Sequence, residues 1–150
     1  MPAPCRAVTI TEVPTPTLRE HVRSHTATLL RRMAYQVRQA AIRADADTVH
    51  DLRVSIRRLR ECLRTFAGLY PAAPRKKVRK ELRKLMKCAE QVRSADIAIA
   101  LLGSAGLTET DTLIREIHAQ RAAHHTQLRD ELTALGGRPY TRSWREVLGL

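Results

Sequence analysis

The sequence predicts an all-α protein, an antiparallel four-helix bundle with a short fifth helix at the C-terminus. Apolar residues recur at alternating spacings of three and four along most of the chain, which is the repeat of one helix face. No segment of useful length alternates polar and apolar residues as a half-buried strand does. The connections between the predicted helices are short and carry glycine or proline, so we expect consecutive helices to pack antiparallel.

A flexible leader and one helical domain are predicted. Residues 1–16 hold four of the seven prolines, so we expect them to form a flexible N-terminal leader. Residues 17–150 are expected to fold as one domain, because a chain of this length can bury roughly two-thirds of its unfolded surface. The first helix is predicted over roughly residues 17–44, since Thr17 and Glu20 have the spacing of a capping box.

Three more long helices and a short one follow. Asp47 is predicted to cap a second helix over roughly residues 48–68, which glycine and proline end. A third helix is predicted over roughly residues 75–102, after a proline and before two glycines. Thr108 and Asp111 have the spacing of another capping box, for a fourth helix that ends at a Gly-Gly pair. The closing stretch WREVLGL predicts the start of the fifth helix.

The positive charge is concentrated in one segment. The net charge is +12 and the sequence pI is about 10.8. From Arg53 to Arg93 the net charge is +11, whereas the rest of the chain sums to only +1. A field of this sign favours polyanions such as nucleic acid, phosphorylated polymers or an anionic membrane surface. The concentration of charge indicates a binding site rather than a general excess of lysine and arginine.

The second predicted helix carries an apolar and a cationic stripe side by side. At about 100° per residue, one helix face collects Val49, Leu52, Ile56, Leu59, Leu63 and Phe66. A neighbouring stripe with the same spacings comprises His50, Arg53, Arg57, Arg60 and Arg64. Acids are too few to pair these arginines, so we predict phosphate binding; the alternative is a solvated face or structural ion pairs. His50 is predicted to donate a hydrogen bond to a phosphate, unless it only caps or packs.

The third predicted helix repeats this arrangement. Its apolar stripe is Val78, Leu82, Leu85, Ala89 and Val92, and Lys76, Lys80, Arg83 and Lys87 lie nearly opposite, flanked by Arg79. We add Arg79, Lys80, Arg83 and Lys87 to the predicted site, although any exposed helix can show such a face. Asp96 falls on the apolar stripe, so we expect it to be buried and paired with an arginine. The predicted partner is Arg93 or an arginine of the second helix.

Several function classes are disfavoured by the sequence. Cys5, Cys62 and Cys88 are scattered, which argues against a disulfide framework and a zinc site. We find no nucleophile with its base, no phosphate-binding glycine loop and no carboxylate cluster, so we predict a protein without catalytic activity, cofactor or metal. The chain has no apolar run long enough for a transmembrane helix and no signal-peptide pattern, so the cytoplasm is the expected compartment.

The second and third predicted helices resemble a known pattern. The run His50-x-x-Arg53-Val54-x-x-Arg57-Arg58-Leu59-Arg60-x-x-Leu63-x-x-Phe66 resembles the signature of the CHAD family, the conserved-histidine α-helical domain. The later stretch VRSADIAIALL is similar to the V-R-D-x-D-V run of that family, with Ser94 in place of the first aspartate. The resemblance covers roughly residues 17–150, which is about one half of the usual two-bundle family architecture (half-CHAD).

The resemblance implies a ligand as well as a fold. Members of the family are helical and bind inorganic polyphosphate through basic residues that line a central groove. The resemblance therefore implies non-catalytic polyphosphate binding, in the cytoplasm or at polyphosphate granules, whereas composition and spacing alone imply only a polyanion. Alternative hypotheses are a protein that binds DNA or RNA backbones and a regulatory subunit of a phosphate-handling enzyme. An aromatic content of 3% disfavours nucleic acid, because few side chains can stack on bases.

A homodimer is also predicted. Trp144, Val147 and Leu148 give the fifth helix apolar side chains that its own length cannot bury. Arg121 and His124 interrupt the inner stripe of the fourth helix. Two copies across a twofold axis would double the charge around one groove, and cyclic dimers are the commonest assembly. We expect the basic stripes to stay apart across that groove and apolar helix faces to make the contact.

Overall fold

A computed structural model describes residues 16–43, 45–137 and 139–150. The predicted leader, apart from its last residue, lies outside these ranges. Within them the chain is all-α, without a strand, and its helices are α1 (Leu18–Ile42), α2 (Ala46–Thr65), the 3₁₀ turn η1 (Ala67–Leu69), α3 (Ala72–Ser104), α4 (Thr112–Gly136) and α5 (Tyr140–Leu148). None of the described helices combines the length and the apolar character needed to cross a bilayer.

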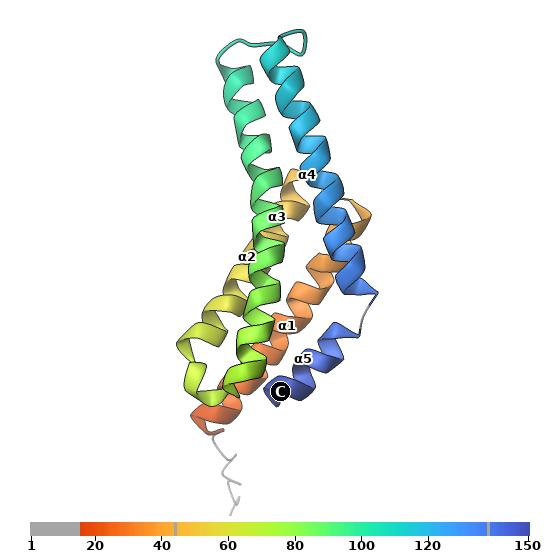
Figure 1. Ribbon diagram of the computed structural model, residues 1–150. Helices are drawn as coiled ribbons and strands as arrows, with labels where there is room; N and C mark the ends of the chain where they lie inside the picture. Colours follow the sequence, from red (N-terminus) through yellow and green to blue (C-terminus); the bar gives the residue numbers. More distant parts are fainter. Residues whose placement is uncertain (1–15, 44, 138) are drawn as a thin grey trace, which may run out of the picture.

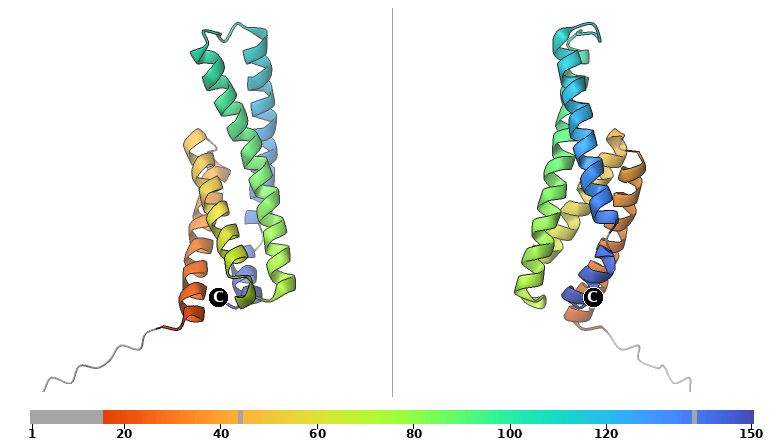
Figure 2. Two further views of the ribbon diagram at one scale, coloured as in Figure 1. Left: turned by 90° about the vertical axis from the view of Figure 1, so that its left-hand side faces the viewer. Right: turned by 45° about the vertical axis from the view of Figure 1, so that its right-hand side comes forward.

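The helices form an antiparallel bundle (Figure 1). Helix α2 packs between α1 and α3, and α4 packs against α3 and α1. Both views of Figure 2 show α3 and α4 continuing as a hairpin beyond the ends of α1 and α2. Helix α4 ends about halfway down the bundle, and α5 continues along the bundle below it, against α3 and α1. The lower half of the bundle is therefore built from α1, α2, α3 and α5.

The core lies where the apolar stripes predicted it. Leu52, Ile56 and Leu63 of α2 are fully buried, as are Leu82 and Ala89 of α3. Neighbouring residues of each stripe are three or four positions apart, which is close to one helical turn. Their side chains therefore lie on the same side of the helix. The predicted stripes of the second and third helices are thus confirmed as core. Phe66 is the exception, because it is half-buried at the C-cap of α2.

The helix starts confirm one predicted cap and correct two others. Thr17 and Glu20 form the predicted capping box. Asp47 was the predicted cap of α2, but Asp45 is the N-cap, and its carboxylate accepts a 2.8 Å hydrogen bond from the Thr48 N–H. The N-cap of α4 is Asp111 and not Thr108, because the helix begins at Thr112. Thr108 instead donates its backbone N–H to the Asp111 carboxylate at 2.6 Å.

Helix α5 corrects an expectation about assembly. It begins at Tyr140, earlier than predicted, and its side chains Trp144 and Leu148 are buried within the same chain. Tyr140 and Trp144 pack edge to face with ring centroids 5.2 Å apart, which is a favourable aromatic geometry. Only Val147 of the three predicted apolar residues stays exposed, at 40%. The fifth helix therefore does not provide the unburied apolar face on which the predicted dimer partly rested.

A buried polar cluster anchors the connection between α2 and α3. The Thr26 hydroxyl of α1 lies 2.6 Å from the Tyr70 hydroxyl and 3.1 Å from the Cys62 sulfur of α2. The same hydroxyl donates to the Val22 carbonyl oxygen at 2.8 Å. Buried polar groups need such partners, because an unsatisfied hydroxyl in the core is costly. The cluster holds the end of α2 and the start of α3 against α1, and so it helps to set how these two helices lie beside each other.

Candidate functional site

The two flanks of α2 face different neighbours. Hollows between α1 and α2 are lined on the α2 side by residues that include Asp51, Ser55 and Arg58, so this flank faces α1. Arg53 and Arg60 lie on the opposite side of the apolar stripe, and α3 is the helix packed there. Both arginines are half-buried. The cationic stripe predicted from the sequence therefore runs along the junction of α2 with α3.

The flanks of α3 can be assigned in the same way. Lys84 forms a 2.8 Å ion pair with Glu131 of α4, so its flank of α3 faces α4. Arg75 and Arg79 lie on the other flank, toward α2, and both are half-buried. Two neighbouring helices thus present arginines to one junction. We call this set the arginine seam, and its members are Arg53, Arg57, Arg60, Arg64, Arg75 and Arg79.

The seam arginines have few partners. Arg64 pairs with Glu61 at 2.8 Å, but both side chains are largely exposed and such a pair contributes at most about 1 kcal/mol. The other five make no ion pair with any described residue. The Nε atoms of Arg53, Arg75 and Arg79 are shielded from solvent and have no hydrogen-bond partner. Arg53, Arg75 and Arg79 nevertheless remain partly exposed, so the seam presents cations that an anion could neutralise.

The length of the seam suits an extended ligand. Arg53 and Arg64 are about three helical turns apart, which is about 16 Å along the axis of α2. A guanidinium presents a planar fork that matches two oxygens of one phosphate group. The arrangement can therefore bind several phosphate groups in a row.

Comparison with known proteins places the chain in a family. The family model of the CHAD domain matches residues 24–149. The chain belongs to the CHAD family. The match covers every helix except the first turns of α1 and includes the whole arginine seam, so the resemblance noted from the sequence is confirmed. No curated protein and no solved structure matches the chain.

His50 and most of the predicted basic residues of α3 are more exposed in the CHAD domain than the half-buried arginines of the seam. His50 lies on the seam side of α2, in its first turns, and is exposed. Lys80 and Lys87 are exposed on the outer side of α3, turned away from the junction with α2, whereas Arg83 is exposed one turn beyond Arg79 on the seam flank. Lys87 instead lines a hollow between α3 and α4 that includes His124. Of the four α3 residues predicted to bind, Arg79 is in the seam and Arg83 lies one turn farther along the same flank.

One seam residue of the CHAD domain was missed. The residues predicted to bind do not include Arg75, and the third helix is predicted from about residue 75, whereas α3 begins at Ala72. The signal was present, since Arg75 precedes Arg79 by four residues and so shares its flank. Arg93 lies on the same flank farther along α3 and is half-buried.

The predicted pairing of Asp96 is corrected in one respect. Asp96 is largely buried, with 11% of its side chain exposed, and it does pair with an arginine. That arginine is Arg121 of α4, not Arg93. Arg121, which interrupts the predicted inner stripe of the fourth helix, is the residue that neutralises Asp96. Within the described part of the CHAD domain, no three His, Cys, Asp or Glu side chains gather closely enough to hold a metal ion.

Proposed function

We propose that this CHAD domain binds inorganic polyphosphate along the arginine seam without catalysing a reaction. The observation that carries the proposal is the row of six arginines along the junction of α2 with α3, five of which form no ion pair with any described residue. Such a row of unneutralised cations favours an anionic ligand with several phosphate groups. The exposed Arg57 and Arg64 extend the same row of cations to the surface.

Polyphosphate fits the seam better than nucleic acid does. Both ligands supply a row of phosphates, so the guanidinium contacts do not discriminate between them. Bases would need aromatic side chains to stack on, and Tyr70, Tyr140 and Trp144 are buried while Phe66 is half-buried. Tyr35 is the one exposed aromatic residue of the described chain, and it lies on α1 at the hollow between α1 and α2. Polyphosphate has no bases, so the scarcity of exposed aromatic side chains does not weaken its binding.

The experiment compares two pairs of charge reversals. Arg57→Glu with Arg60→Glu changes the seam, whereas Lys80→Glu with Lys87→Glu changes the outer side of α3 by the same charge. We expect the first pair to weaken binding of labelled long-chain polyphosphate at least tenfold and the second pair less than threefold. Binding to the parent protein is expected to weaken steeply with salt, because each phosphate contact releases counterions. Equal losses in both pairs would show that only the net charge matters and would remove the seam as the site.

A competition separates the two ligand classes. Labelled polyphosphate bound to the parent protein is challenged with duplex DNA, single-stranded RNA and heparin at equal total charge. We expect unlabelled polyphosphate to displace the label at a concentration at least tenfold below that of the other polyanions. Equal displacement by all of them would leave a general polyanion-binding protein and would contradict specificity for polyphosphate.

We also propose that the protein acts as a homodimer in the cytoplasm or at polyphosphate granules. A second copy that faced the seam across a twofold axis would surround one ligand with twice the number of arginines. The repulsion between two such surfaces is strong without ligand, so polyphosphate would stabilise the dimer by screening it.

A further inference from the structure

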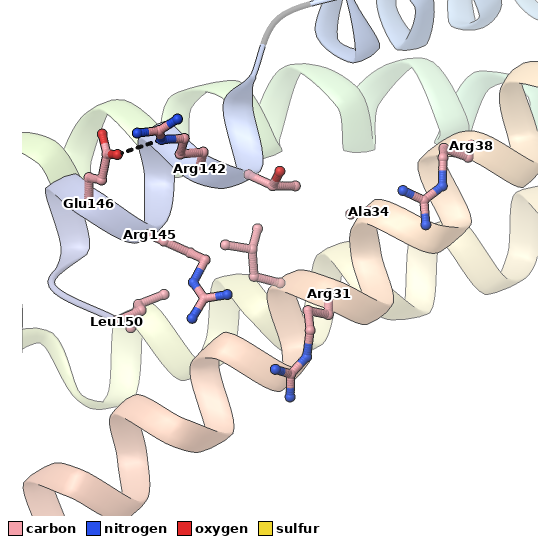
Figure 3. Close-up of a pocket in the computed structure, with 9 residues that line it drawn as sticks. Arg31, Ala34, Arg38, Arg142, Arg145, Glu146 and Leu150 are labelled. Atoms are coloured by element: carbon pink, nitrogen blue, oxygen red, sulfur yellow. Dashed lines mark hydrogen bonds and ion pairs between the residues drawn. The ribbon is translucent and has the colours of Figure 1, made fainter.

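A second cluster of arginines lies between α1 and α5. A pocket of about 630 Å³ separates the two helices, and its lining includes Arg31 and Arg38 of α1 with Arg142 and Arg145 of α5. Figure 3 shows Arg145 reaching from α5 toward α1, on which Arg31 and Arg38 lie. The floor contains Leu30, which is buried in the core. The volume is in the range of small-molecule sites, about 300–1,000 Å³.

The charge in this pocket is not balanced by the protein. Glu146 is the acidic side chain of the lining, and Arg142 holds it at 2.9 Å (Figure 3). Arg31 donates one hydrogen bond to the Thr28 hydroxyl, but Arg31, Arg38 and Arg145 form no ion pair with any described residue. Arg31, Arg38 and Arg145 therefore line one pocket without a carboxylate partner among the described residues.

Tyr140, which lies near Arg38, does not supply a counter-charge. Burial raises the pKa of Tyr140 to about 12, against an opposing effect of the Arg38 charge, so the phenol stays protonated at neutral pH. The repulsion among these cations is relieved only by solvent or by a bound anion.

The pocket and the arginine seam lie on different sides of the bundle. Helices α2 and α5 each pack against both α1 and α3, so they occupy opposite corners of the lower bundle. The seam is at the junction of α2 with α3, and the pocket is at the junction of α1 with α5. The buried core, with Met33 of α1 and Leu82 of α3 in it, separates them. One compact ligand cannot reach both clusters.

We propose that the pocket between α1 and α5 is a second anion site, which binds a compact anion with two or three phosphate groups. Arg31 and Arg38 are about two turns apart on α1, or about 10 Å along its axis, so a single phosphate is too small to engage the whole cluster. A diphosphate or triphosphate group can bridge the arginines of α1 and Arg145 of α5. This site does not depend on the function proposed for the seam.

The test uses inorganic tripolyphosphate as the probe and the full chain. Binding is measured by calorimetry, because Trp144, the single tryptophan, lines the hollow between α3 and α5 and not this pocket. Arg38→Gln with Arg145→Gln removes two charges from the pocket. Arg115→Gln with Arg129→Gln is the matched control, because these two exposed arginines of α4 line neither cluster. Arg57→Gln with Arg79→Gln tests the seam.

We expect the pocket variant to lose tripolyphosphate affinity at least tenfold and the α4 control to stay within twofold. The pocket variant should keep its affinity for long-chain polyphosphate within about threefold, which separates this site from the seam. The same probe attached to adenosine, as a nucleoside triphosphate, shows whether the pocket takes free or esterified phosphates. The proposal is overturned if all three variants bind tripolyphosphate alike, or if only the seam variant loses it. It is also overturned if sulfate at equal ionic strength competes as well as pyrophosphate does.

Discussion

Arg121 of α4 donates a 2.5 Å hydrogen bond from its Nε to a carboxylate oxygen of Asp96 on α3. The two residues are far apart in sequence, and the exposed fractions of their side chains are 27% and 11%. The second Asp96 oxygen is shielded and has no hydrogen-bond partner. The pair joins α3 to α4 in the half of each helix that leads to their connection, where the side chains Ile97, Leu101 and Leu113 are exposed and apolar packing is sparse.

Loss of this pair should destabilise the fold. We expect Asp96→Ala to lower the free energy of unfolding by about 1.5–3 kcal/mol, because it leaves a half-buried guanidinium without its partner. For a chain of this size the melting temperature should fall by about 3–12 °C. Arg93→Ala is the control, since Arg93 is half-buried on the same helix and makes no ion pair with a described residue. Similar melting of both variants would show that the pair contributes nothing.

Two adjacent residues of α3 should differ in their effect on ligand binding. Arg79 faces the seam and Lys80 faces solvent, although each carries one positive charge. We expect Arg79→Gln to weaken polyphosphate binding at least fivefold and Lys80→Gln less than twofold, measured as dissociation constants at one salt concentration. Without ligand, Arg79→Gln should not lower the melting temperature, because it removes a shielded Nε that has no partner. A larger loss of affinity in Lys80→Gln would place the ligand on the outer side of α3.

The start of α2 should respond to pH through Asp45. Hydrogen bonds from the side chain and backbone of Thr48 lower the pKa of the Asp45 carboxyl. A carboxyl whose pKa is lower in the folded state stabilises the protein above its unfolded pKa, and this contribution disappears as the pH falls through the folded pKa. Asp45→Ala should therefore lower the melting temperature at pH 7 more than Asp47→Ala does, and the difference should shrink below about pH 3.8. A difference that persists in strong acid would contradict the role of the charged cap.

The assembly can be measured directly by light scattering. We expect twice the 17.0 kDa chain mass in the presence of polyphosphate and a smaller dimeric fraction without it. Arg57→Glu is the informative variant, because weaker ligand binding at the seam should also reduce the ligand-dependent dimer. A mass of one chain under both conditions would leave a monomer with an open seam.

Much of the fold could be predicted because local patterns determine it. The spacing of Leu52, Ile56 and Leu63 marks a buried helix face whatever the neighbouring helix is. The start of α2 could not be predicted from residue type, since Asp45 and Asp47 both suit an N-cap. The backbone conformation decides between them, because Asp45 is extended and Asp47 is already helical. The cationic stripe of α2 was predicted correctly as a stripe, because its residues share a side of one helix.

By itself, the sequence determined the helices, their buried faces and the concentration of arginine on α2 and α3. The tertiary structure decided which flank of each helix meets a neighbour, and this selected Arg75 and Arg79 for the seam over Lys80 and its companions on the outer side of α3. It also paired Asp96 with Arg121 and brought Arg38 of α1 beside α5. The physical reason is that helix periodicity is local, whereas contacts between helices depend on how all the apolar stripes pack together.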